Sequence, residues 1–232
     1  MNTIVLNIPH ATPCSDFTAW SDPDVIKAEH DKWTDWHTDT IFKDHKDRVI
    51  VHKACRSRYD VDMERLPEDP MEEHGQGIRY TSSKDGKSVR KATETTLATV
   101  KAVYASYHKE LKELTKAEGT LLIDCHSFPS DYAEAGNASG AEVDICIGFN
   151  DDSSRPSDEL IAMVKEHFEG AGYSVGVNSP FSNSIVGTPT CPSIMIELNK
   201  KVYLNEKTHD LLPWAYKLNQ VINRLYENIF NF

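Results

Sequence analysis

Short β-like runs that alternate with longer stretches of helical periodicity constrain the fold of this chain most strongly. The β-like runs span residues 3–8, 48–52, 120–124, 143–147, 173–177 and 193–198, and the helix-like stretches span 22–43, 88–118, 155–169 and 206–228. Alternation of this kind is typical of a central, mostly parallel sheet that helices cover on both faces. We therefore predict an α/β fold.

No linker divides the chain. Its 232 residues contain no Gly/Ser-rich or Pro-rich stretch between two periodic regions, so we predict one domain over residues 1–232. The nearest candidate for a boundary is the loop 67–86. This loop is either a surface excursion or a lid over a site, with Gly75, Gly77 and Gly86 as candidate hinges.

The charge of the chain excludes some classes of partner. A formal net charge of −11 disfavours binding to nucleic acid or to an anionic membrane, since both select clustered Lys and Arg. No apolar run approaches the length of a membrane span. A small acidic substrate remains compatible with this charge, because a local pair of arginines outweighs the overall field.

The cysteines indicate a reducing compartment. Cys14, Cys55, Cys125, Cys146 and Cys191 are odd in number and form no CxxC pair, which is typical of reduced thiols. Met1 leads directly into a β-like run, without the basic and apolar regions of a secretory signal. We expect a cytoplasmic protein.

Two histidines follow β-like runs and predict a metal site. His10 comes after the run 3–8, and His126 comes after the run 120–124. Ligands gather at the carboxyl ends of strands in α/β sheets, and a catalytic zinc takes three protein ligands and leaves a position for water. On a helix, Asp35 and Asp39 lie one turn apart on the same face, while His37 points elsewhere. Asp35 is therefore the better third ligand, and Asp39 is a candidate partner that orients an imidazole.

Each of these residues also has an ordinary interpretation. A single histidine beside a strand is more often a hydrogen-bonded structural residue, and carboxylates on a helix face are usually solvated. The metal hypothesis therefore depends on the combination of residues, and the choice between Asp35 and His37 stays open at this point.

A segment rich in arginine is a candidate for binding anions. Residues 56–65 place Arg56, Arg58 and Arg65 among carboxylates. Taken alone, this composition is more typical of a solvated loop. Arginine forks also bind carboxylates and stabilise developing oxyanions, which a hydrolase of an acidic amide requires.

Glu197 interrupts the β-like run 193–198 where a buried strand would carry another aliphatic residue. A carboxylate there is costly unless it is paired or used. Close to a metal it would act as a general base and then as an acid. The alternative is an outward-facing strand residue, because Glu197 shares its strand face with Met195.

Six short motifs in order resemble the N-formylglutamate amidohydrolase family. They are Pro9-His10-Ala11, Thr34-Asp35-Trp36-His37, Ser57-Arg58-Tyr59 with Asp62 and Arg65, Asp124-Cys125-His126-Ser127, Asn178-Ser179-Pro180-Phe181, and Glu197-Leu198 with Tyr203. The family is similar to zinc carboxypeptidases and aspartoacylase-like deacylases. The resemblance implies a phosphorylase/hydrolase-like three-layer α/β sandwich with a mixed central sheet, and hydrolysis of an amide that carries a carboxylate.

The resemblance also implies roles for individual residues. His10, Asp35 and His126 would bind one Zn²⁺ per chain. Arg58 would stabilise the oxyanion, and Arg65 would hold a substrate carboxylate. Glu197 would be the general base. Asn178 is a further candidate for substrate binding.

Two departures from the family pattern concern specificity. Glu64 stands where relatives carry an asparagine, so an acceptor-only carboxylate replaces an amide that can donate. Ser182-Asn183-Ser184 stands where relatives often carry a lysine and two glycines. If Glu64 faces the pocket, it repels a second substrate carboxylate.

The sequence thus predicts a zinc-dependent amidohydrolase that cleaves a non-backbone amide, such as that of N-formylglutamate or another N-acyl amino acid. Carboxypeptidase-like cleavage of a short peptide and a non-catalytic, metal-binding relative are the alternatives. A cysteine hydrolase that uses Cys125 with His126 is disfavoured, because adjacent strand residues point to opposite faces.

Overall fold

The computed structural model describes residues 1–13, 20–44, 47–90, 94–132, 143–187 and 189–232. Its chain divides into two compact units. Unit 1 contains Met1–Ile8, Trp36–Lys53 and Leu111–Phe232, and unit 2 contains Pro9–Asp35 and Ala54–Glu110. Cys14 lies outside the described residues.

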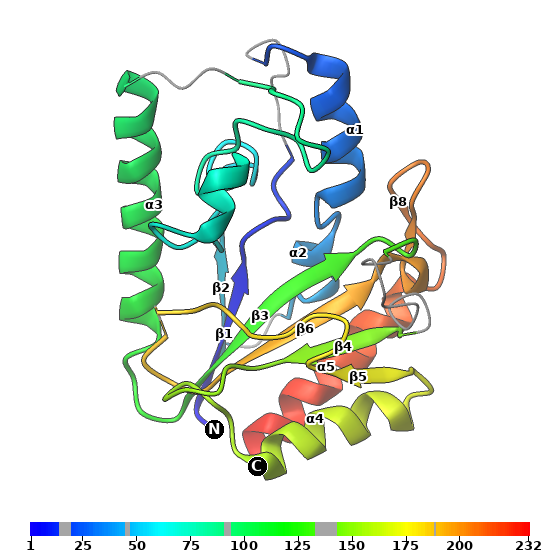
Figure 1. Ribbon diagram of the computed structural model, residues 1–232. Coiled ribbons are helices and arrows are strands. Elements are labelled where there is room, and N and C mark those ends of the chain that lie inside the picture. Colours follow the sequence, from blue (N-terminus) through cyan, green and yellow to red (C-terminus); the bar gives the residue numbers. More distant parts are fainter. Residues whose placement is uncertain (14–19, 45–46, 91–93, 133–142, 188) are drawn as a thin grey trace. The chain divides into compact units, whose positions relative to one another are not determined.

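A six-stranded sheet forms the centre of unit 1 (Figure 1). Its strands are β1 (Thr3–Ile8), β2 (Val49–Lys53), β3 (Thr120–Phe128), β4 (Ile145–Gly148), β5 (Val175–Val177) and β6 (Ser193–Asn199). They lie in the order β2-β1-β3-β6-β4-β5. The neighbouring strands β2, β1, β3 and β6 run parallel to one another. β4 is antiparallel to β6 and parallel to β5. The predicted α/β fold with a mixed central sheet is therefore confirmed.

The central strands are buried on both faces. Every residue of β3 and every residue of β6 is buried, so polar residues on these strands lie inside the protein. Burial on both faces is what a sheet flanked by helices requires.

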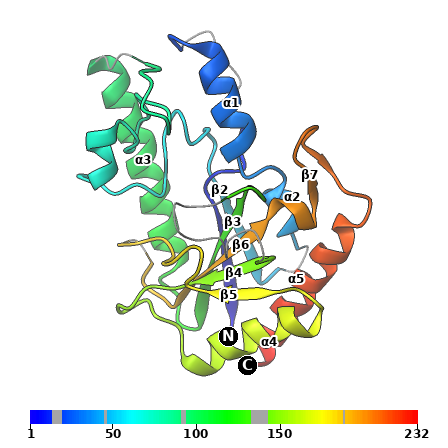
Figure 2. The same ribbon diagram turned by 45° about the vertical axis from the view of Figure 1, so that its right-hand side comes forward.

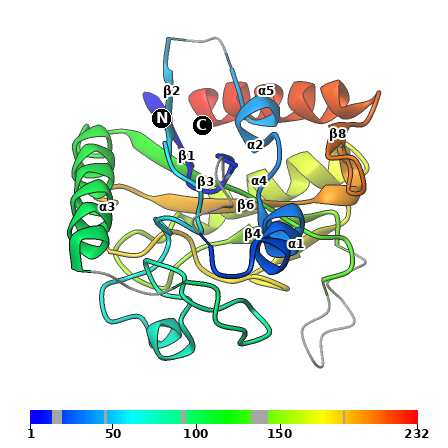
Figure 3. The same ribbon diagram turned by 90° about the horizontal axis from the view of Figure 1, so that it is seen from above.

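Among three helices of unit 1, one packs against the other two. They are α2 (Thr38–Ile41), α4 (Asp158–Gly170) and α5 (Ala215–Asn231). α5 lies beside both α2 and α4 (Figures 2 and 3). The Asn219 Nδ2 donates to the Ile41 carbonyl at 2.8 Å, and His167 Nε2 lies 2.8 Å from the Val221 carbonyl. A hairpin of β7 (Leu204–Asn205) and β8 (Asp210–Leu211) precedes α5.

Unit 2 contains α1 (Pro23–Trp33), the 3₁₀ turn η1 (Pro70–His74) and most of α3 (Glu94–Leu114). Asp22 caps α1 by accepting from the Val25 N–H, and Pro23 occupies the first turn. The core of unit 2 contains an apolar cluster of five buried residues, against which two partly buried residues pack. The five are Trp20, Ile26, Tyr59, Tyr80 and Val89, and the two are Val25 and Trp33.

The loop 67–86 is held by backbone pairing. It contains η1, and isolated bridges join Gln76 to Tyr80 and Ser82 to Ser88. Gly75 ends η1 with φ of 70°, a left-handed conformation that glycine adopts without steric cost. Its role as a lid stays a prediction, as does the assignment of residues 1–232 to one domain.

Several predicted boundaries were wrong. The stretch 22–43 is two helices, since α1 ends at Trp33, Thr34 is extended, and His37 has φ of 61°. The argument that placed Asp35 and Asp39 on one helix face therefore fails. β3 continues to Phe128, so His126 lies within the strand. The stretch 206–228 begins after β7 and contains β8 of the hairpin, and its helix starts only at Ala215.

Among the described helices, none has the length and apolar character needed to cross a bilayer. Cys55 is exposed, whereas Cys125, Cys146 and Cys191 are buried, and all four are free thiols.

Candidate metal centre and active site

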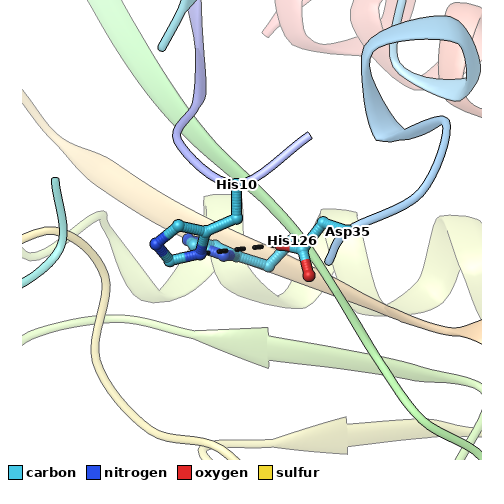
Figure 4. Close-up of side chains that lie close together, drawn as sticks. All are labelled: His10, Asp35 and His126. Carbon is cyan, nitrogen blue, oxygen red and sulfur yellow. Dashed lines mark ion pairs between the residues drawn. The ribbon is translucent and has the colours of Figure 1, made fainter. Parts of the chain in front are cut away.

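His10, Asp35 and His126 form a group of potential metal ligands (Figure 4). Their exposed fractions are 3%, 2% and 7%. Two imidazoles and one carboxylate are a donor set that catalytic zinc sites use. The three candidate ligands predicted from the sequence are therefore all buried, His10 and Asp35 in unit 2 and His126 in unit 1.

Two of these ligands belong to unit 2. His10 follows the end of β1 and Asp35 follows the end of α1, and the Asp35 N–H donates to the His10 carbonyl at 3.1 Å. The His10 Nδ1 lies 3.7 Å from the Asp35 Oδ2. Ligand atoms of a tetrahedral zinc stand roughly 3.3 Å apart, so this pair needs only a small adjustment to share one ion.

A buried carboxylate fixes the orientation of His10. The His10 Nε2 lies 2.8 Å from the Asp62 Oδ1. Burial and the nearby Arg58 charge lower the pKa of His10, against the opposing effect of Asp62. A neutral imidazole that donates from Nε2 to a carboxylate presents Nδ1 as its acceptor atom. That atom is the one nearest Asp35, which fits metal ligation.

His126 has a similar partner in unit 1. Its Nε2 lies 3.2 Å from the Asp124 Oδ1. Asp124 is 1% exposed and also accepts from the Asn7 Nδ2 at 2.8 Å and from the Ile185 N–H at 2.7 Å. Burial alone would raise the pKa of Asp124, but the charge and hydrogen bond of His126 outweigh it and lower that pKa. Asp124 is therefore an ionised acceptor for His126.

Glu197 lies beside His126 on the neighbouring strand. The two residues are register partners of β3 and β6, so their side chains share one face of the sheet. Glu197 is 9% exposed, and the alternative of an outward-facing strand residue is therefore wrong. On the other side it pairs in register with Cys146. Burial raises the pKa of that thiol to about 11, and the Glu197 charge contributes to the rise.

Unit 2 contains a group of cations. The Arg58 Nη2 donates to the Asp62 Oδ2 at 3.3 Å, and the Arg65 Nε lies 3.9 Å from the same oxygen. The Lys84 Nζ lies over the Trp33 ring, 3.2 Å from its centroid. Burial, together with the positive charges of Arg58 and Arg65, lowers the pKa of Lys84 to about 7. The region is therefore suited to an anionic ligand.

The other site residues predicted from the sequence contact neighbours that are not candidate metal ligands. Asp39 forms an ion pair with Lys53 at 2.6 Å, and the His37 Nε2 lies 2.8 Å from the His209 carbonyl. Asn178 is exposed and its Oδ1 accepts from the Phe149 N–H at 3.0 Å. Glu64 is half-buried, and its backbone N–H donates to the Asp62 Oδ1.

Cys125 is poorly suited to act as a nucleophile. It is fully buried, and its Sγ donates to the Ile123 carbonyl at 3.3 Å. Burial, with a contribution from Asp124, raises the pKa of its thiol well above the ordinary value. The reactive form of a cysteine is the thiolate, which this environment suppresses.

Sequence reasoning assigned no role to Asp62, Asp124 or Lys84. A signal for Asp124 was present, because residues two apart on a strand share a face and Asp124 stands two before His126. No comparable local signal links Asp62 to His10, which is 52 residues away.

Each unit of this α/β protein carries a histidine paired with a buried carboxylate, His10 with Asp35 close by in unit 2 and His126 beside the buried Glu197 in unit 1, and these are candidate ligands of a catalytic metal. The family model of the N-formylglutamate amidohydrolases matches residues 2–204. The chain belongs to the N-formylglutamate amidohydrolase family, a family of hydrolases.

Solved structures agree on the fold. The N-formylglutamate amidohydrolase of Ralstonia eutropha JMP134 is similar with a TM-score of 0.76 and 18% identity, over 96% of this chain and 90% of the other. A gene product of Agrobacterium tumefaciens is similar with a TM-score of 0.66 and 19% identity, over 98% of this chain and 91% of the other. None of the curated proteins matches the chain.

Proposed function

We propose that this protein is a zinc-dependent amidohydrolase that cleaves the amide of an N-acyl amino acid such as N-formylglutamate. The observation that carries the proposal is that His126, paired with the buried Asp124, has Glu197 in register beside it in unit 1; in unit 2, the His10 Nδ1 lies 3.7 Å from the Asp35 Oδ2. Membership of a hydrolase family supports the reaction class.

In this proposal His10, Asp35 and His126 hold the metal. Both imidazoles pair through Nε2 with buried carboxylates, Asp62 and Asp124, which favours Nδ1 as the ligating atom. Zinc, when bound, supplies Lewis acidity that lowers the pKa of water and polarises the acyl carbonyl.

The other residues would move protons and stabilise charge. A carboxylate oxygen of Glu197 takes a proton from the attacking water and later delivers it to the departing nitrogen. Arg58 donates to the oxyanion that develops on the acyl carbonyl. Its Nη2 already donates to Asp62, so the guanidinium is fixed before substrate arrives.

The cations of unit 2 support a substrate with a carboxylate. Arg65 is partly exposed and provides a fork for a carboxylate, and Lys84, whose pKa is lowered to about 7, adds positive charge in its protonated form. Asn178 and Glu64 stay proposals as residues that contact substrate. An acceptor-only carboxylate at Glu64 favours a substrate that offers an amine or amide donor near that position.

Glu64 also favours a second candidate function, carboxypeptidase-like cleavage of a short peptide, because the free amine of a peptide can donate a hydrogen bond to this carboxylate. A panel of N-acyl amino acids and dipeptides separates the two activities by their kcat/KM values. We also propose a cytoplasmic location, which the four free cysteines support.

The first test is metal content by plasma mass spectrometry. We expect about one zinc per wild-type chain, retained in the control variant His74→Ala, whose side chain is exposed, and lost in His126→Ala. Absence of zinc from the wild type, even after reconstitution, would leave a non-catalytic relative as the better interpretation.

The base is tested by Glu197→Gln. The variant should keep its zinc, because Glu197 is not a proposed ligand, and lose about 100-fold or more in kcat. Turnover near the wild-type rate in the zinc-loaded variant would reject Glu197 as the base.

A further inference from the structure

Asp62 lies fully buried in unit 2 and gathers donors on both carboxylate oxygens. Its Oδ1 accepts from the His10 Nε2 at 2.8 Å and from the Glu64 backbone N–H at 3.0 Å. An ionised carboxylate only accepts, so the proton between His10 and Asp62 belongs to Nε2. This oxygen therefore determines which nitrogen of His10 faces Asp35.

The other oxygen faces a different set of groups. The Asp62 Oδ2 accepts from the Tyr80 hydroxyl at 3.2 Å and from the Arg58 Nη2 at 3.3 Å, with the Arg65 Nε at 3.9 Å. One carboxylate thus contacts a candidate metal ligand through one oxygen and two candidate substrate-binding cations through the other.

The surroundings hold Asp62 rigidly. The Asp62 N–H donates to the Ile78 carbonyl at 2.8 Å, and the preceding turn is closed by the Val61 N–H on the Ser57 carbonyl at 3.0 Å. Tyr80 is 1% exposed and packs edge-on against Tyr59 with ring centroids 5.2 Å apart. A carboxylate anchored on this scaffold keeps the positions of its partners.

We propose that Asp62 is the positioning residue of the active site, which orients His10 for the metal and fixes Arg58 and Arg65 for the substrate at the same time. This inference rests on the proposed zinc-dependent function. In this proposal Asp62 itself touches neither metal nor substrate, and it acts through His10, Arg58 and Arg65.

Asp62→Asn tests this role with almost no change in volume. Asparagine offers one oxygen and one NH₂ group, so it can accept on one side only. If the amide oxygen of the introduced asparagine stays on His10, its NH₂ group faces the Tyr80 hydroxyl and the Arg58 Nη2, which also donate. If the amide oxygen turns to Arg58, the NH₂ group faces the His10 Nε2 and favours the tautomer of His10 that carries its proton on Nδ1.

The experiment measures zinc affinity by competition with a chromogenic chelator, together with KM and kcat, at one pH for the wild type, Asp62→Asn and Tyr80→Phe. Tyr80→Phe is the matched control for zinc binding, because it removes the hydroxyl that contacts Asp62 and Arg65 and keeps both the carboxylate and the packed ring. We expect Asp62→Asn to weaken zinc binding about 10- to 100-fold and Tyr80→Phe to change it less than about threefold. With zinc saturating, Asp62→Asn should also raise KM, through the arginines.

A wild type that binds no zinc would contradict the proposed function, whatever Asp62 does. A wild type that binds zinc and an Asp62→Asn variant with the same affinity and the same KM would overturn the inference alone.

A second measurement needs no folded variant at position 62. Long-range ¹H–¹⁵N spectra of the zinc-free wild type report histidine tautomers, and the signals of His10 are those that disappear in His10→Gln. We expect the Nε2–H tautomer. The Nδ1–H tautomer would overturn the assignment even if Asp62→Asn fails to fold.

Discussion

Neighbouring residues of β3 have opposite chemical environments. His126 shares a face with Glu197, whereas the Cys125 side chain points to the other face and is fully buried. Alternation along one strand thus separates the proposed metal ligand His126 from the buried Cys125 thiol only one residue away.

Cys125→Ser should therefore keep kcat/KM within about twofold of the wild type, since no nucleophile is removed. Serine is close in volume, and its hydroxyl can donate to the Ile123 carbonyl as the thiol does. A loss of several orders of magnitude in the folded variant would restore the cysteine mechanism. As a control, Ellman's reagent should label Cys55 in the native protein and leave Cys125 unlabelled.

Sequence reasoning reached the candidate residues that carry their own signal. A histidine after an apolar run and a glutamate inside one both break a local pattern, and His10, His126 and Glu197 were found in this way. Asp62 breaks no pattern in a segment already rich in charge, and its contact with His10 is tertiary. Partners of this kind depend on packing that one sequence does not encode locally.

At the scale of elements, the strands were predicted better than the helix boundaries. The six β-like runs correspond to the six strands of the sheet, because apolar runs bounded by polar residues are a strong signal for buried strands. The break between α1 and α2 was missed, because no proline or glycine marks residues 34–37 and the extended and left-handed conformations there are set by tertiary contacts. The Tyr203 hydroxyl donating to the Trp36 carbonyl at 2.8 Å is one of these.

Asp144, just before β4, forms hydrogen bonds and an ion pair that hold the start of this strand. Its carboxylate accepts from the Ser174 hydroxyl at 2.9 Å and from the Ser174 N–H at 3.0 Å, and it pairs with Lys201 at 3.1 Å. Burial would raise the pKa of Asp144, but these bonds outweigh it and lower the pKa below the ordinary 3.8.

A carboxyl whose pKa is lowered by folding stabilises the protein above its unfolded pKa, and this contribution is lost as the pH falls through the folded pKa. Asp144→Asn should therefore reduce the free energy of unfolding by about 1 kcal/mol at neutral pH. The difference from the wild type should shrink below pH 3.8. Urea titrations at several pH values measure it, with Asp151→Asn, a fully exposed aspartate, as the control. A difference that stays constant down to low pH would contradict this assignment.

At the scale of the whole molecule, the proposed ligands come from distant parts of the chain. His10, Asp35 and His126 are separated by up to 116 residues, so an unfolded chain does not present them together. Zinc should therefore bind the folded protein and stabilise it by mass action.

Free zinc at about 100 times its dissociation constant should raise the free energy of unfolding of the chelator-treated wild type by about 2.7 kcal/mol. For a chain of this length, that corresponds to roughly 5–10 °C in Tm. His126→Ala should show a much smaller shift under the same conditions. Equal shifts in both proteins would mean that zinc binds elsewhere.

The order of strands in the sheet has a consequence for synthesis. β6 is the last of the six strands in the sequence, yet it lies in the interior of the sheet, between β3 and β4. Until residues 193–199 have left the ribosome, β3 keeps an open edge that can pair with another chain. The strand that closes this edge also carries Glu197, so a growing chain obtains its proposed general base in the same step that makes its sheet continuous.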